Sequence, residues 1–113
     1  MIKLYVFDSN KKEPYQRLNG LIELIIDPEN VPNDLSMYNG AIIHHYGLDC
    51  HGHLITESKL RNKPIFFYGS SSDEGVDISY SIGYHPDIND NVFILQNLDL
   101  LVDKVIERFK LSK

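Results

Sequence analysis

The sequence predicts a single α/β domain built on a parallel β-sheet, and three observations lead to this prediction. Five short segments rich in Ile, Val, Leu, Phe and Tyr recur along the 113 residues, each bounded by turn-forming residues. The connections between them are about 13 to 23 residues long, which is enough for the crossovers that parallel neighbours require. The last segment of the chain has the apolar period of an α-helix.

The five apolar segments are predicted to be β-strands. Their near-continuous apolar character is typical of strands covered on both faces, whereas half-exposed antiparallel strands alternate apolar and polar residues. We therefore expect one parallel sheet between two outer layers, a three-layer α/β sandwich. The predicted strands are Ile2 to Phe7, Leu21 to Ile26, Ala41 to His45, Pro64 to Tyr68 and Val92 to Leu95.

Helical signals are strongest after the fifth strand. Asn97 is a suitable N-cap there, and the apolar residues behind it form one stripe at a 3.6-residue period. That stripe consists of Leu98, Leu101, Val102, Val105, Ile106 and Phe109. A second helix is predicted over part of Leu54 to Leu60, and a short one after Pro14.

The other crossovers are poor in helix. Residues 28–33 are rich in Pro and Asn, and residues 75–86 mix Gly, Ser, Tyr and Ile without a helical period. The sequence therefore predicts that some crossover helices are shortened or missing.

Composition limits the function classes. The length and the 42% hydrophobic content suit one domain over residues 1–113 with one core. The net charge of -5 and the absence of a Lys/Arg-rich run argue against nucleic acid and against an anionic membrane. No segment approaches the roughly 20 apolar residues that span a bilayer. The single cysteine, Cys50, and an N-terminus that runs straight into strand-like sequence lead us to expect a cytoplasmic protein.

The order of strands and helices, with an amphipathic helix directly after the fifth strand, resembles the receiver domain of bacterial response regulators. The resemblance covers nearly the whole chain and implies a flavodoxin-like sheet with the strand order 2-1-3-4-5. In that family, acidic residues after strand one hold Mg²⁺ and an Asp ending strand three accepts phosphate. A Ser or Thr ends strand four, and a Lys-Pro pair ends strand five.

This sequence departs from that pattern at the positions that do the chemistry. After the first strand, at most one acidic residue, Asp8, is present where the family usually has two. The position of the acceptor Asp is occupied by His44, or by His45 if the register is shifted by one residue. Gln96-Asn97 replaces the Lys-Pro pair, whereas hydroxyls remain near the switch position. Because phosphotransfer to Asp needs a carboxylate nucleophile and a carboxylate-held metal, we expect no phosphorylation on aspartate.

A ligand crevice in an open parallel sheet lies beyond the carboxyl ends of the strands, where the strand order reverses. The candidate crevice residues are Asp8, Ser9, His44, His45, Ser70, Ser71 and Gln96. They either bind a small anion or a metal or form an ordinary polar rim. A small enzyme with His44 or His45 as its acid-base residue is one alternative function.

The stretch from residue 44 to residue 53 is unusually rich in metal-ligating residue types. A zinc site would draw on His44, Cys50, His51 and His53. However, no regular Cys-x₂-Cys or His-x₃-His pair is present, and adjacent strand residues point to opposite faces. We therefore expect no metal and no cofactor, and interpret these residues as turn residues and satisfied edge histidines.

The region before the fifth strand is unusually aromatic for a loop. Together with the fifth strand it offers an interaction surface formed by Tyr80, Ile82, Tyr84 and Phe93, because Tyr buries a large area while keeping a polar tip. Alternatively, these side chains close the core where a crossover helix is missing. The function that the sequence favours is a non-catalytic regulatory module that binds a protein partner or self-associates.

Overall fold

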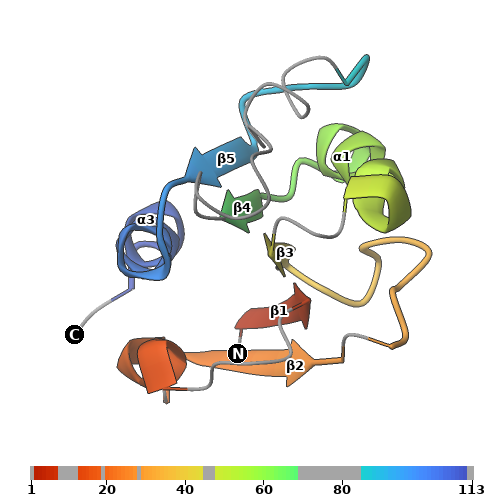
Figure 1. The fold of residues 1–113 in the computed structure, drawn as a ribbon. Coiled ribbons are helices and arrows are strands. Elements are labelled where there is room, and N and C mark those ends of the chain that lie inside the picture. The colour runs from red at the N-terminus through yellow and green to blue at the C-terminus, as the bar shows by residue number, and fades with distance from the viewer. Residues whose placement is uncertain are drawn as a thin grey trace.

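The computed structural model describes residues 2–7, 13–18, 20–27, 29–44, 48–68 and 85–111. Its centre is a five-stranded sheet in the order β2-β1-β3-β4-β5 (Figure 1). All four neighbouring pairs are parallel. The predicted parallel sheet and the strand order implied by the resemblance are both confirmed. The strands are β1 (Ile2–Phe7), β2 (Ile22–Ile26), β3 (Gly40–His44), β4 (Ile65–Tyr68) and β5 (Val92–Leu95).

The outer layers contain two α-helices and one 3₁₀ helix in the described part of the chain. These are η1 (Glu13–Leu18), α1 (Leu48–Arg61) and α3 (Leu98–Phe109). Figure 1 shows α1 on one face of the sheet and α3 on the other, so the chain forms three layers. No described helix is long and apolar enough to span a membrane.

Each face of the sheet buries its own apolar cluster, because successive side chains of a strand point to opposite faces. On the face of η1 and α3, the core includes Leu4, Ile42 and Phe66 from the strands. On the face of α1, the core includes Tyr5, Ile43 and Phe67. The apolar runs of the sequence therefore have the physical cause that was inferred for them: both sides of each central strand are covered.

Strand limits differ from the predicted ones by single residues. Leu21 lies in the turn before β2, and β3 begins one residue earlier than predicted, at Gly40. Pro64 precedes β4 instead of starting it, because proline has no N–H for the ladder. The Pro64 carbonyl still joins the sheet, since it accepts a 3.1 Å hydrogen bond from the Ala41 N–H.

The predicted C-terminal helix and its cap are confirmed. The Asn97 side chain accepts a hydrogen bond from the N–H of Leu100, and Lys110 ends the helix in a left-handed conformation. The short helix expected after Pro14 is η1. As predicted, the crossover between β2 and β3 forms no helix in its described residues.

The helix before β4 corrects two expectations. It spans Leu48–Arg61, far beyond the predicted part of Leu54 to Leu60, so Cys50, His51 and His53 are helical and are not turn residues. Its first turns contain Gly52 and two histidines, which have low intrinsic helix propensity. A contact with a distant segment supports the helix here, since the His53 side chain lies 2.8 Å from the carbonyl oxygen of Pro32, within hydrogen-bond distance.

Gly52 offers a first test of α1. A Cβ at this position would lie 3.7 Å from Nε2 of His85, which is ordinary van der Waals contact. Because glycine is a poor helix former, Gly52→Ala is expected to raise the free energy of unfolding by about 0.5–1 kcal/mol. Urea denaturation measures this change. A loss of stability would mean that His85 packs more tightly against α1 than the structure shows.

Candidate functional site

The carboxyl ends of the parallel strands lie on the same side of the sheet. His44 of β3 is in register with Tyr68 of β4, and Tyr68 is in register with Leu95 of β5. Phe7 of β1 is in register with Ile43, one residue before His44. The structure therefore brings the ends of these four strands level, as the crevice prediction requires.

Few residues of the predicted crevice can be placed at these strand ends. Gln96 follows β5 and has an exposed side chain, and the described part of β3 ends at His44. The other predicted crevice residues lie outside the described residues and stay predictions: Asp8, Ser9, His45, Ser70 and Ser71. The interaction residues Tyr80, Ile82 and Tyr84 also lie outside the described residues.

Among the described residues at the strand ends, Asp27, directly after β2, is the one that carries a carboxylate. Its carboxylate accepts hydrogen bonds of 3.2 Å from the N–H groups of Glu29 and Asn30, and it also contacts the Asn30 side-chain amide. The Asp27 carboxylate is therefore used in hydrogen bonds within its own turn. Phe7, His44, Tyr68 and Leu95, which end the other strands, carry no carboxylate.

Tyr5 of β1 also contacts the turn at Asp27. Its buried hydroxyl donates a 2.9 Å hydrogen bond to the carbonyl oxygen of Asp27. Burial, together with the nearby charge of Asp27 and the phenol of Tyr38, raises the pKa of Tyr5 to about 12. The phenol is therefore neutral at physiological pH and acts as a structural donor.

The metal hypothesis gains no support from the described residues. They contain no group of three or more His, Cys, Asp or Glu side chains that could hold a metal ion. Of the four candidate ligands, His53 is exposed and lies beside the Pro32 carbonyl oxygen. The side chains of His44, Cys50 and His51 lie outside what the structure describes.

A polar network that the sequence did not predict joins α1 to residues 85–91. Thr56 Oγ1 donates a 2.7 Å hydrogen bond to Asp87, and Lys59 Nζ lies 3.6 Å from the same carboxylate. The buried Ser58 hydroxyl accepts a 3.0 Å hydrogen bond from the Asn89 side chain and donates to the carbonyl of Ile55. These groups satisfy one another, so the network fastens the segment before β5 to α1.

The titration of Asp87 gives a second prediction. The hydrogen bond from Thr56 and the charge of Lys59 hold the pKa of Asp87 below its ordinary value. A lowered folded-state pKa contributes stability above the unfolded pKa of about 3.9, and this stability is lost as the pH falls through the folded value.

Thr56→Val is therefore expected to lower the melting temperature more at about pH 6 than at about pH 2.5. Thermal unfolding followed by circular dichroism measures both differences, and Thr56→Ser, which keeps the hydroxyl, is the matched control. Equal losses at the two pH values would show that the Thr56 hydroxyl does not act through the Asp87 charge.

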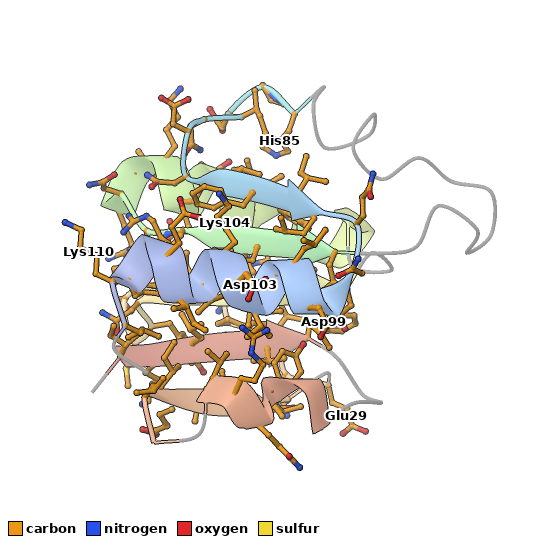
Figure 2. The ribbon with its side chains drawn as sticks, turned by 90° about the vertical axis from the view of Figure 1, so that its left-hand side faces the viewer. Glu29, His85, Asp99, Asp103, Lys104 and Lys110 are labelled. Carbon is orange, nitrogen blue, oxygen red and sulfur yellow. The ribbon has the colours of Figure 1, made fainter. Side chains whose placement is uncertain are left out.

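The described part of the predicted interaction surface lies where β5 meets α3. The Phe93 ring is partly exposed and stacks on Phe66, with 5.3 Å between ring centroids and 16° between ring planes. Lys104 Nζ lies 5.6 Å from the centroid of the Phe93 ring, and Figure 2 shows Lys104 on the side of α3 that faces β5. Arg108 donates a 3.3 Å hydrogen bond to Asn91, just before β5.

Leu100 extends this surface along α3. It lies one helical turn before Lys104, on the same side of the helix, and 45% of the residue is exposed. We name the surface formed by Phe93, Leu100, Lys104 and Arg108 the β5–α3 face. It combines two apolar side chains with two cations of α3, and Lys104 Nζ also lies 3.4 Å from the Glu107 carboxylate.

No family model, curated protein or solved structure matches this chain. The layout of the sheet is therefore a finding of the structure, whereas the resemblance to receiver domains stays a prediction from the sequence.

Proposed function

We propose that this domain is a receiver-like regulatory module that has no phosphotransfer activity and acts by binding a protein through its β5–α3 face. The observation that carries the proposal is the exposure of β5. All four of its apolar residues are only partly buried, whereas all four residues of the neighbouring strand β4 are buried. Apolar and aromatic side chains at such a position are typical of the core of an interface.

The strand ends support the non-catalytic part of the proposal. The described ends of β1, β3, β4 and β5 carry Phe7, His44, Tyr68 and Leu95, so the carboxylate that would accept a phosphoryl group is missing from them. Gln96, an uncharged residue, follows β5 where a receiver has its Lys. A neutral amide cannot supply the positive charge that stabilises a phosphoryl group.

The chemistry of the face indicates the kind of partner. Phe93 and Leu100 provide apolar area, and Lys104 and Arg108 provide positive charge beside it. Opposite charges across an interface steer association and fix its register. We therefore propose a partner segment that presents apolar side chains together with Asp or Glu.

Site-specific photo-crosslinking in the native cell tests the β5–α3 face. Benzoylphenylalanine at position 100 is expected to give a discrete adduct, and Lys104→Glu in the same chain should reduce its yield. Leu60 of α1 is the matched control position, since it lies on the opposite face of the sheet and is 73% exposed, more than Leu100. An equal or stronger adduct from position 60 would mean that crosslinking follows exposure alone and would contradict the proposed face.

A further inference from the structure

Among the described residues, no strand pairs with the outer edge of β2. β2 is the terminal strand of the sheet, and no labelled element lies beyond it in Figure 1. An unpaired strand edge is a template for a further strand, and natural proteins usually protect it with charges, bulges or prolines. In β2 this protection is limited to one charged residue, Glu23, in the sequence Ile22-Glu23-Leu24-Ile25-Ile26.

The hydrogen-bond pattern shows which groups of β2 are free to pair. The N–H of Asp27 donates to the carbonyl oxygen of Val6 on β1. Because backbone groups alternate in direction along a strand, Glu23 and Ile25 also pair toward β1. Ile22, Leu24 and Ile26 therefore direct their N–H and C=O groups outward.

We propose that two copies of this chain associate by antiparallel pairing of their β2 strands. A two-fold axis requires the paired strands to be antiparallel. With the axis at Leu24, each Leu24 faces its counterpart and each Ile22 faces the partner's Ile26. Every outward backbone group then meets a complementary group, so the edge matches itself.

The side chains fit the same register. Glu23 lies opposite Ile25 of the other copy, so the two exposed carboxylates are not directly opposed. Ile25 is partly exposed and packs against neither of the two core clusters found among the described residues. Pairing would place the Glu23 side chain of the other copy beside this partly exposed side chain and so reduce its exposure.

The opposite edge of the sheet is less suited to this pairing. The Asn91 carbonyl accepts a hydrogen bond from the N–H of Ile65 in β4, so the backbone groups of Phe93 and Leu95 also point toward β4. The N–H of Val92 donates to the carbonyl oxygen of Asn89 and is not free to pair. Only Ile94 among the β5 residues keeps both backbone groups outward. Pairing through β2 also leaves the β5–α3 face free for a protein partner, because β2 and β5 are at opposite ends of the sheet.

The association is expected to be finite and weak. β2 begins after Gly20, which has a positive φ of 80°, and ends at the Asp27 turn, so pairing is limited to one short strand. An isologous contact closes on itself as a dimer and does not propagate. Five residues bury less than the roughly 1,200 Å² of a standard interface, so we expect a micromolar or weaker dissociation constant.

Charge substitutions at position 25 test the register by sedimentation equilibrium. Ile25→Lys places a cation opposite Glu23 of the other copy, whereas Ile25→Glu places an anion there, and the symmetry doubles each effect. The dimer dissociation constant of I25K is expected to be at least about tenfold lower than that of I25E. The double variant E23K/I25E restores an opposite-charge pair and should recover dimerisation.

Both substitutions occupy the same partly exposed position, and circular dichroism shows whether each variant is folded. An intermolecular NOE between the Hα atoms of Glu23 and Ile25 in a mixed-label sample would identify the register directly. The proposal is wrong if I25K stays monomeric at the highest soluble concentration, or if folded I25K and I25E associate equally. Neither result bears on the crosslinking test of the β5–α3 face.

Discussion

Leu35→Ala is expected to lower the free energy of unfolding by about 2–5 kcal/mol, the usual loss for removing a fully buried Leu side chain. Leu35 is 0% exposed and lies in the crossover between β2 and β3, which forms no helix in its described residues. Its side chain belongs to the core cluster on the α1 face and so covers the sheet where a crossover helix would otherwise do so.

Charged residues hold the backbone of Leu35 in place. Its N–H donates a 3.0 Å hydrogen bond to Glu57, and its carbonyl accepts a 2.7 Å hydrogen bond from Lys63. The bond from Leu35 and the contact with Arg61 hold the pKa of Glu57 below its ordinary value, so this carboxylate is ionised at neutral pH. Leu35 and its two backbone contacts therefore help to fix the crossover, and Val31 and Tyr38 pack against the same cluster.

Met37→Ala is the matched control, because Met37 lies in the same loop and is 72% exposed. Its effect on stability is expected to stay within about 0.5 kcal/mol. Urea denaturation of both variants gives the comparison. Similar losses for Leu35→Ala and Met37→Ala would mean that the loop does not pack against the sheet as described.

Gly40→Ala is the substitution with the next largest expected effect, a loss of about 1–3 kcal/mol. A Cβ on Gly40 would lie 2.5 Å from the carbonyl oxygen of Pro64 and 3.2 Å from a methyl group of Leu4. The Pro64 carbonyl is backbone and accepts the Ala41 N–H, so it cannot move without disturbing the pairing of β3 with β4.

Gly20 provides the comparison for Gly40, because the two glycines are required for different reasons. Apart from its chain neighbours, no atom of the described residues lies within 4 Å of a Cβ on Gly20, but its φ is +80°. Asn tolerates a left-handed backbone, so Gly20→Asn is expected to be milder than Gly20→Ala. Gly40→Asn should be at least as damaging as Gly40→Ala, since its side chain is larger. The opposite order at either position, measured by urea denaturation, would contradict these reasons.

The parts of the fold that were predictable have local causes. The five strands were recognisable because both faces of the central strands are buried, and α3 because its apolar stripe and its Asn97 cap lie within one segment. The first turns of α1 were missed because Gly52 and its histidine neighbours disfavour a helix locally. Contacts from distant segments, such as that between His53 and Pro32, are absent from any local pattern.

The polar network of Thr56, Ser58, Asp87 and Asn89 was missed for a related reason. Residues 85–91 are rich in Asp and Asn, which predicts only a turn. Their hydrogen bonds reach α1 across 31 positions of the sequence, and such pairing leaves no periodic signal. The position of the strand ends, in contrast to the polar network, follows from the sequence pattern, because parallel strands all end on the same side of the sheet. The side of the sheet on which the strands end could therefore be predicted, whereas a crevice on that side, with Asp8 and Ser70 in it, stays a prediction.

We propose that the domain has a receiver-like sheet without receiver chemistry, and titration with Mg²⁺ and beryllofluoride tests this proposal most directly. Two-dimensional ¹H–¹⁵N NMR follows the backbone amides, intact mass after acetyl phosphate treatment follows covalent transfer, and an active receiver domain in parallel controls the reagents. We predict no saturable shifts at Phe7, His44, Tyr68 or Gln96 and no phosphoryl adduct. Saturable shifts at these strand ends, or an added phosphoryl group, would show a working anion site and contradict the proposal.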